Sequence, residues 1–348
     1  MQVQLSESKN PLAYLLLIAP FFLWGTAMVA MKGIIPHTTP LFMAGVRLIP
    51  AGVLILMVAG FMGKPVPKSW LAWLWIIIFA LVDGTLFQGF LAEGLVRTNA
   101  GLGSVMIDSQ PLAVALLSFW LFQEHIGLWG WLGLGFGIIG ISLIGLPQEW
   151  IFNLFDSGIT IYTDNWQQLF NNGEWLMLLA ALSMAVGTVM IRFVCQYADP
   201  VMATGWHMII GGLPLWGISS VLESQQWQNL LLSDWMALSY ATVFGSAIAY
   251  GLFFYFASSG NLTSLSSLTF LTPVFALIFG YIFLSEVLTI IQWLGVFLTL
   301  ISIYLINQRE KIGVKNQTIT INEINNPEES LTLELSPKKV PSTELNQR

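Results

Sequence analysis

Charged side chains are scarce in this chain. Asp, Glu, Lys and Arg make up 9% of the 348 residues, whereas an ordinary soluble domain carries about 25%. Twelve of the 32 charged residues lie in the last 41 positions, so the rest of the chain is poorer still. No basic stripe is left for nucleic acid, which we therefore exclude as a partner. Hydrophobic residues reach 55%, and this balance predicts an all-α polytopic membrane protein.

Cysteine and the motifs of soluble enzymes are also lacking. The one cysteine, Cys195, excludes an internal disulfide framework and a cysteine-rich metal site. The sequence holds no H-E-x-x-H zinc motif and no Walker A motif. Gly135-Phe-Gly137-Ile-Ile-Gly140 fits the dinucleotide pattern G-x-G-x-x-G, but it lies in an apolar run with no strand before it. We therefore expect no enzyme activity, no metal and no cofactor.

Long apolar runs, by contrast, are abundant. A helix that crosses a bilayer needs about 20 predominantly apolar residues. Turns that contain Pro, Gly or charged residues separate ten runs that meet this requirement. We predict ten transmembrane helices, at roughly 11–31, 40–60, 70–91, 98–122, 128–146, 174–195, 200–222, 234–257, 261–284 and 289–307.

An internal repeat organises these helices. Residues 98–146 recur at 260–307, and placing Pro111 on Pro273 also aligns the glutamates, tryptophans and glycines that follow. Each half holds five helices, an odd number, so the second half must enter the membrane inverted. We predict two inverted five-helix repeats, and divide the chain into an N-terminal segment at 1–10, a first repeat at 11–146, an interfacial loop at 147–172, a second repeat at 173–307 and a disordered tail at 308–348.

The distribution of Lys and Arg predicts the orientation. With the N-terminus inside, the outer segments carry only Lys32 and Arg97. The inner segments carry Lys9, Lys64, Lys68, Arg192, Arg309, Lys311 and Lys315. The positive-inside rule therefore places both termini in the cytoplasm. We expect an integral protein of the cell membrane, of plasma or bacterial inner-membrane type.

Several short motifs resemble those of a known family. Phe22-Leu-Trp-Gly-Thr26 followed by Lys32 looks like the first helix of an EamA domain, as do Ala100-Gly-Leu-Gly-Ser104, Pro111 and Glu124 further on. A second copy runs through Leu265-Ser266, Pro273 and Glu286, although Met184-Ala185 replaces its Trp-Gly pair. The chain is thus similar to ten-helix transporters of the drug/metabolite transporter superfamily. That resemblance implies two five-helix bundles around a central cavity, and often the export of amino acids or other small metabolites.

Three charged residues fall at a similar depth within consecutive predicted helices. Arg47, Asp83 and Asp108 lie about 13, 12 and 15 Å from the outer helix ends, at a rise of 1.5 Å per residue. Charges at this depth are costly and usually face a cavity or a partner. The repeat matches Arg47 with His207, but it matches the two acids with Gly245 and Phe270. This asymmetry favours a polar substrate site with a proton-titratable carboxylate over the alternative, a structural ion pair.

Other polar and aromatic residues are candidates for the same site. His207 either titrates near neutral pH or packs as a hydrogen-bonded residue. Gln88 and Tyr250, which the repeat aligns, either bind substrate or join helices. Trp24 and Trp206 either line the cavity or belong to aromatic packing.

Four residues are candidates for structural or gating roles. Glu124 and Glu286 lie at matched helix ends, where capping, hinge or gate hydrogen bonds are expected. Pro111 and Pro273 lie midway along matched helices, where each frees a backbone carbonyl and allows a kink.

Together these features predict a secondary transporter. We expect the export of a small polar metabolite such as an amino acid, by alternating access and with proton coupling. The expected partners are a small-molecule substrate and membrane lipid, and a homodimer is left open. The alternative is a membrane-embedded sensory or binding protein that signals through its cytoplasmic tail.

Overall fold

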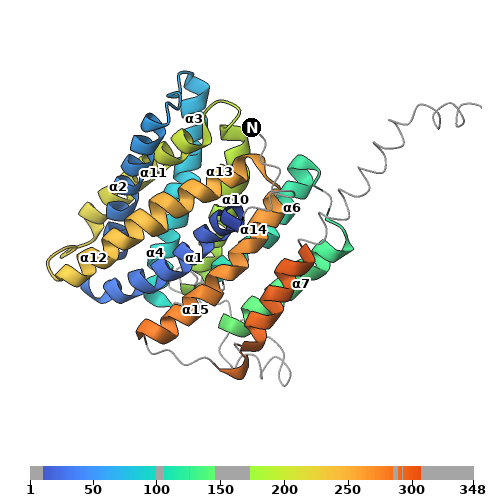
Figure 1. Ribbon diagram of the computed structural model, residues 1–348. Coiled ribbons are helices and arrows are strands. Elements are labelled where there is room, and N and C mark those ends of the chain that lie inside the picture. Colours follow the sequence, from blue (N-terminus) through green and yellow to red (C-terminus); the bar gives the residue numbers. More distant parts are fainter. Residues whose placement is uncertain are drawn as a thin grey trace, which may run out of the picture.

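The computed structural model describes residues 11–98, 103, 106–124, 126–145, 173–284, 289–291 and 293–306. These parts form a bundle of helices that run side by side (Figure 1). The predicted N-terminal segment 1–10, interfacial loop 147–172 and tail 308–348 lie outside the described residues, as does Glu286.

The helices follow the ten predicted segments. In the described part of the chain, seven helical stretches are long and apolar enough to cross a membrane, and three further apolar helices are shorter. The first repeat contains α1 (Pro11–Ile34), α2 (Pro40–Phe61), α3 (Trp70–Phe79), η2 (Ala80–Leu86), α4 (Phe87–Arg97), α6 (Gln110–Phe122) and α7 (Leu128–Gly145). The second contains α10 (Gly173–Val194), α11 (Pro200–Leu222), α12 (Leu232–Tyr240), η3 (Ala241–Ile248), α13 (Ala249–Ser259), α14 (Leu262–Ser267), η4 (Leu268–Phe270), α15 (Leu271–Leu284) and the last helix, Trp293–Ile306.

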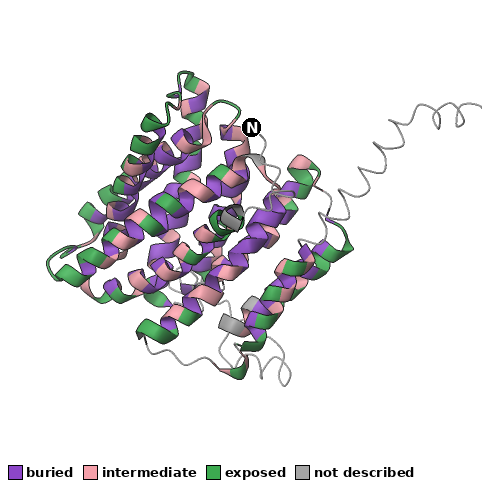
Figure 2. Cartoon of the chain, in the orientation of Figure 1, coloured by how far each residue is buried: buried purple, intermediate pink, exposed green. Residues whose placement is uncertain are grey.

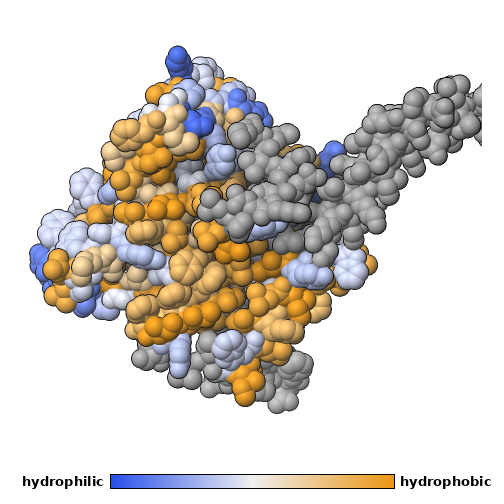
Figure 3. All heavy atoms as spheres, viewed as in Figure 1, coloured by the Kyte–Doolittle hydropathy of each residue, from blue (hydrophilic) through white to orange (hydrophobic). Residues whose placement is uncertain are grey.

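The surface of the bundle is apolar. Hydrophobic side chains form a broad region in the middle of the described face seen in Figure 3, and buried residues gather where helices meet (Figure 2). Phe61, Trp120 and Ile290 are exposed by 91%, 79% and 88%. A water-soluble protein rarely exposes so much apolar surface, whereas lipid solvates it without cost. The fold is therefore that of an all-α polytopic membrane protein.

The second helices of the two repeats, α2 and α11, pack directly against each other. Glycine permits this close approach: a Cβ atom built on Gly52 would lie 2.6 Å from the carbonyl oxygen of Gly205. A Cβ on Gly45 would lie 2.9 Å from the backbone nitrogen of Trp216. Small residues allow the same approach between other transmembrane helices. This contact joins the two repeats at positions where the backbones of α2 and α11 approach each other closely.

Acidic side chains close both ends of the α2–α11 pair. At the end where α2 begins, which we call the His37 end, Glu223 accepts hydrogen bonds from the backbone nitrogens of Leu41 and Phe42, each at 3.0 Å. At the opposite end, the Lys64 end, Asp199 accepts from the backbone nitrogen of Val201 at 3.0 Å and pairs with Lys64 at 3.0 Å. Carboxylates at helix N-termini satisfy donors that have no partner in the helix.

The repeat is also visible in two basic side chains. Lys32 donates to the carbonyl oxygen of Thr98 at 3.0 Å, where α4 ends. Arg192 donates to the carbonyl oxygen of Gly260, where α13 ends. Cations stabilise helix C-termini, whose carbonyls are partly unpaired. The sequence repeat matches Lys32 with Arg192 and Thr98 with Gly260, so the two halves use the same device.

Replacing Gly52 with alanine should destabilise the protein, because the new methyl group would overlap the backbone of α11. We expect a loss of about 1–3 kcal/mol in the free energy of unfolding, measured as a lower melting temperature of the detergent-solubilised protein. Gly60 is the matched control in the same helix, because a Cβ there meets nothing within 4 Å. Equal effects of the two substitutions would contradict the proposed backbone contact.

Candidate functional site

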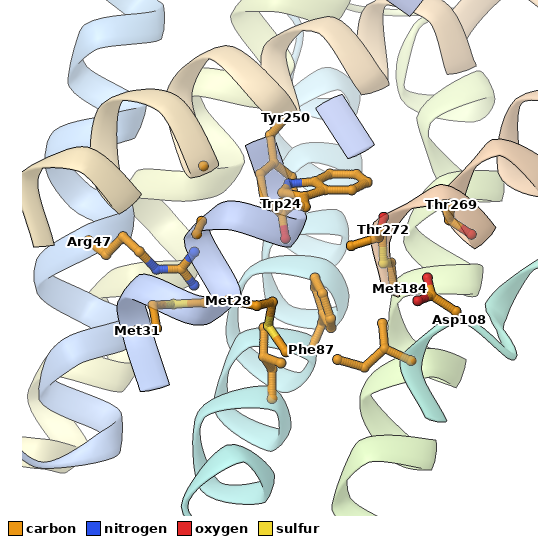
Figure 4. A pocket seen from close by; sticks show the side chains of 14 residues that line it. Trp24, Met28, Met31, Arg47, Phe87, Asp108, Met184, Tyr250, Thr269 and Thr272 are labelled. Atoms are coloured by element: carbon orange, nitrogen blue, oxygen red, sulfur yellow. The ribbon is translucent and has the colours of Figure 1, made fainter. Parts of the chain in front are cut away.

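A cavity lies between the two repeats at mid-depth in the bundle (Figure 4). Both repeats contribute to its wall, which is mainly apolar with one Arg, one Asp, one Tyr and two Thr side chains. It is lined by Trp24, Ala27, Met28, Met31, Arg47, Phe87, Leu91, Ile107, Asp108, Met184, Gly245, Tyr250, Thr269 and Thr272. Four of the residues predicted for the site therefore line it: Trp24, Arg47, Asp108 and Tyr250.

The guanidinium group of Arg47 is held by neutral oxygen atoms. It donates to Ser246 Oγ at 3.1 Å and to Gln88 Oε1. Arg47 is only 3% exposed. Even so, it forms no ion pair with a carboxylate among the described residues. Its Nε atom has no partner in that part of the chain. The positive charge is thus left available to an anionic group in the cavity.

Gln88 and Tyr250 extend this arrangement. Gln88 Nε2 donates to the Tyr250 hydroxyl at 2.6 Å, so Gln88 bridges Arg47 and Tyr250. Because a phenol can donate as well as accept, the Tyr250 hydroxyl keeps a proton to donate. Both Arg47 and Tyr250 line the cavity (Figure 4). Gln88 of α4 thus links Arg47 of α2 to Tyr250 of α13, and these bonds orient the cation.

A π-helical turn in each repeat shapes this region. In η3 the Ser246 hydroxyl donates at 3.0 Å to the carbonyl of Ala241, five residues earlier, and it accepts from Arg47. In the first repeat, η2 holds Asp83. A π-helical turn inserts one extra residue and is frequent at functional sites. Nothing in the apolar sequence signals either turn, so Ser246 was absent from the predicted site.

Asp108 lies at an interruption of the fourth transmembrane segment. It is 3% exposed and sits in the turn just before α6 begins at Gln110. In the matched segment of the second repeat, η4 interrupts the helix just before α15 and carries Thr269. Figure 4 shows Asp108, Thr269 and Thr272 gathered at one end of the cavity. Discontinuous transmembrane helices commonly build substrate sites at mid-depth.

The interruptions account for the two prolines. Pro111 lies in the first turn of α6, where its missing N–H costs no hydrogen bond. Pro273 follows η4 at the start of α15. The sequence predicts a kink within a continuous helix at Pro111. The structure instead has a break in the helix just before this proline.

Asp83 lies outside the cavity and pairs with His207. His207 Nε2 lies 3.1 Å from Asp83 Oδ2, and His207 Nδ1 lies 2.8 Å from the carbonyl oxygen of Thr204. Both side chains are buried, and Phe79 and Phe254 enclose the imidazole. The predicted cluster of Arg47 with both acids is therefore divided: Arg47 and Asp108 line the cavity, and Asp83 joins η2 to α11.

The hydrogen bonds restrict the protonation of this pair. The Thr204 carbonyl can only accept, so His207 Nδ1 carries a proton. The bond between Nε2 and Oδ2 then contains one proton, held by either atom. The pair is an imidazolium with a carboxylate, or a neutral imidazole with a carboxylic acid, and its net charge is zero in both cases.

Trp206 and Glu124 serve contacts away from the cavity. The ring of Trp206 packs edge-to-face on Trp73 with centroids 5.0 Å apart, and it is not among the lining residues. Glu124 accepts from the Thr263 hydroxyl at 2.9 Å, beside the first residues of α14, and pairs with Arg192 at 3.1 Å. Glu124 thus joins the two repeats at the Lys64 end.

A second groove, between α2 and α12, lacks groups for recognition. Its lining is apolar except for Ser239 and Thr242, whose hydroxyls donate to the carbonyls of Trp235 and Leu238 in their own helix. No charged residue lines it. The cavity around Arg47 is therefore the better candidate for the functional site.

Comparisons with known proteins agree on the class of the molecule. The model of the EamA-like transporter family matches twice, at residues 11–146 and 171–308. An uncharacterised transporter from Synechocystis sp. is 63% identical, over 92% of this chain and 97% of its own length. A chloroplastic WAT1-related protein of Arabidopsis thaliana is 52% identical, over 85% of this chain and 69% of its own. One solved crystal structure shares the fold, with a TM-score of 0.66 and 16% identity over 84% of this chain and 94% of that one.

Asp83→Asn should leave the fold nearly unchanged, because an asparagine amide can donate to Nε2 of a neutral His207. Asp83→Ala removes the partner of the buried imidazole, and we expect it to lower the free energy of unfolding by about 1–3 kcal/mol. The melting temperatures of both purified variants test this expectation. If the asparagine variant is as unstable as the alanine variant, the pair depends on charge and not on the hydrogen bond.

Proposed function

Because this chain belongs to the EamA-like transporter family, and is therefore a membrane transporter, we propose that it exports a small amphipathic metabolite with a carboxylate and an amine, an amino acid in the broad sense. The alternative of a sensor that signals through its tail draws no support from the described residues. The proposed transport is secondary, because the sequence holds no motif for nucleotide hydrolysis.

The observation that carries this proposal is the state of Arg47. A buried guanidinium is expensive unless its charge is compensated. Here the protein supplies two neutral acceptors and leaves the charge facing a cavity built by both repeats. An anionic substrate completes the compensation. A structural arginine would be expected to have its carboxylate partner within the protein.

Alternating access fits the distribution of contacts around the cavity. Its lining includes Met31 and Leu91, near the His37 ends of α1 and α4. At the Lys64 end, Arg192 ties Glu124 to Gly260, and the rings of Phe122 and Phe193 pack at 5.5 Å. The two repeats are also joined at the His37 end, where Thr39 donates to Glu223 and His37 pairs with Asp234. Alternating access requires the contacts at one end to open while those at the other end stay closed.

The proposed membrane and orientation follow from charge. The excess of Lys and Arg at the Lys64 end supports a cytoplasmic location for that end and for both termini. We propose the cell membrane as the location.

The first test compares metabolites in the medium of cells that express the wild type or Arg47→Gln at matched membrane levels. We expect at least one amine-bearing acid to accumulate with the wild type only, because Arg47 holds its carboxylate. Arg97→Gln is the control: it removes the same charge from an ion pair with Glu93 outside the cavity. Accumulation with both variants would make Arg47 structural, and no accumulation in any strain would count against export.

The second test concerns coupling to protons. Asp108 is the carboxylate that lines the cavity, so we propose that it carries the coupled proton. In proteoliposomes, Asp108→Asn should abolish the stimulation of substrate flux by a pH gradient, so that any flux that remains is the same with and without the gradient. Asp83→Asn should keep the stimulation, since the Asp83–His207 pair lies outside the cavity. Retained stimulation in Asp108→Asn would rule Asp108 out as the proton carrier.

A further inference from the structure

The cavity has a cationic and an anionic end, and their separation bears on the shape of the substrate. We infer that the substrate carries its carboxylate and its amine at opposite ends of an apolar spacer, as an ω-amino acid does, rather than on one carbon, as an α-amino acid does. The inference rests on the proposed function, because it names the class of molecule that the same cavity transports.

Figure 4 shows the separation directly. Arg47 projects from α2 at one end of the cavity, and Asp108 lies at the other end, next to Thr269. Two groups that are apart in one view are at least as far apart in space. The first helix, α1, crosses between them and presents Met28 to the space in the middle. The charged ends therefore belong to different elements with apolar side chains between them.

The middle of the cavity is apolar. Between the charged ends the wall carries thioether and aromatic side chains: Trp24, Met28, Phe87 and Met184. Methionine adapts its shape to flexible or irregular ligands. An alkyl or aryl spacer would lose its hydration there and gain contacts along its length. A charged group in the same place would lose its hydration without gaining a partner.

The Asp108 end offers acceptors for an ammonium group. A primary ammonium has three N–H donors and no acceptor. Thr269 uses its hydroxyl proton on the Ser266 carbonyl at 2.7 Å, so its oxygen keeps lone pairs to accept. Thr272 Oγ1 is buried, and it has no partner among the described residues. The Asp108 carboxylate and these two hydroxyls thus place acceptor oxygens, and no cation among the lining residues, at this end of the cavity.

The Arg47 end offers donors for a carboxylate. The guanidinium and the Tyr250 hydroxyl both belong to lining residues, and Gln88 links them by hydrogen bonds. An α-amino acid bound there by its carboxylate would place its ammonium beside the cation and near Met28 and Met31. In that position the guanidinium of Arg47 would repel the ammonium, and the neighbouring methionines would offer it no carboxylate partner. A spacer removes the conflict by carrying the amine to Asp108.

The test uses two isomers with the same atoms and the same charges. 6-Aminohexanoate carries its amine at the far end of the chain, whereas norleucine carries it beside the carboxylate; 8-aminooctanoate serves as a longer homologue. Binding to the purified full-length protein is followed by the quenching of tryptophan fluorescence, to which Trp24 contributes. We expect the better ω-amino acid to bind at least about tenfold more tightly than norleucine.

End-specific variants then assign each charge. Hexanoate should lose affinity in Arg47→Gln and keep it in Asp108→Asn, whereas hexylamine should show the reverse. Phe61→Ala, at an exposed position outside the cavity, is the control and should change neither. Loss of both ligands in one variant, with an unchanged melting temperature, would overturn the assignment of separate ends.

The outcomes separate this inference from the proposed function. Tighter binding of norleucine, lost in Arg47→Gln, would overturn the inference and leave an amino-acid transporter. If no isomer binds while Arg47→Gln still abolishes the export of a cellular metabolite, the transporter stands and these spacers are rejected. If no isomer binds and Arg47→Gln changes no metabolite, both the inference and the proposed function fail.

Discussion

Burying a guanidinium in the membrane without a carboxylate beside it is the constraint on which the site depends. Arg47 must be solvated by the protein, and neutral oxygens do this without cancelling its charge. One of these oxygens comes from Gln88 in the first repeat and the other from Ser246 in the second. The two halves must therefore keep a fixed position relative to each other at mid-depth. The glycine contacts between α2 and α11 hold this position, because they let the two backbones approach each other most closely.

The two buried carboxylates Asp83 and Asp108 have different environments, and the difference is set by local backbone geometry. Asp83 lies in a π-helical turn that directs it away from the cavity and onto His207. Asp108 lies in a break between helical segments, where its side chain reaches the cavity. The protein thus places one acid in a pair with no net charge and keeps the other at the surface of the cavity. The first joins two helices, and the second can meet a ligand in the cavity.

Much of the architecture could be predicted from the sequence, because a bilayer imposes strong rules on composition. The ten apolar segments and the matched corners of the two repeats follow from hydropathy and from the positions of Pro and charge. The depths of Arg47, Asp83 and Asp108 follow from the helical rise. Their partners do not, since pairing depends on how each helix is rotated about its axis. The π-helical turns change that rotation by one residue, and no residue type in 80–86 or 241–248 requires such a turn.

The position of these two turns also carries information about descent. A π-helical turn is one residue more than an α-helix needs, and it occurs in the third transmembrane segment of both repeats at matched places. Two independent insertions at the same site are a less economical explanation than one insertion in a single five-helix ancestor that later duplicated. The extra residue is then older than the differences between the side chains of the two halves. The later divergence changed the side chain that the turn presents, an acid in one copy and Gly245 followed by a hydroxyl in the other, while the turn itself remained.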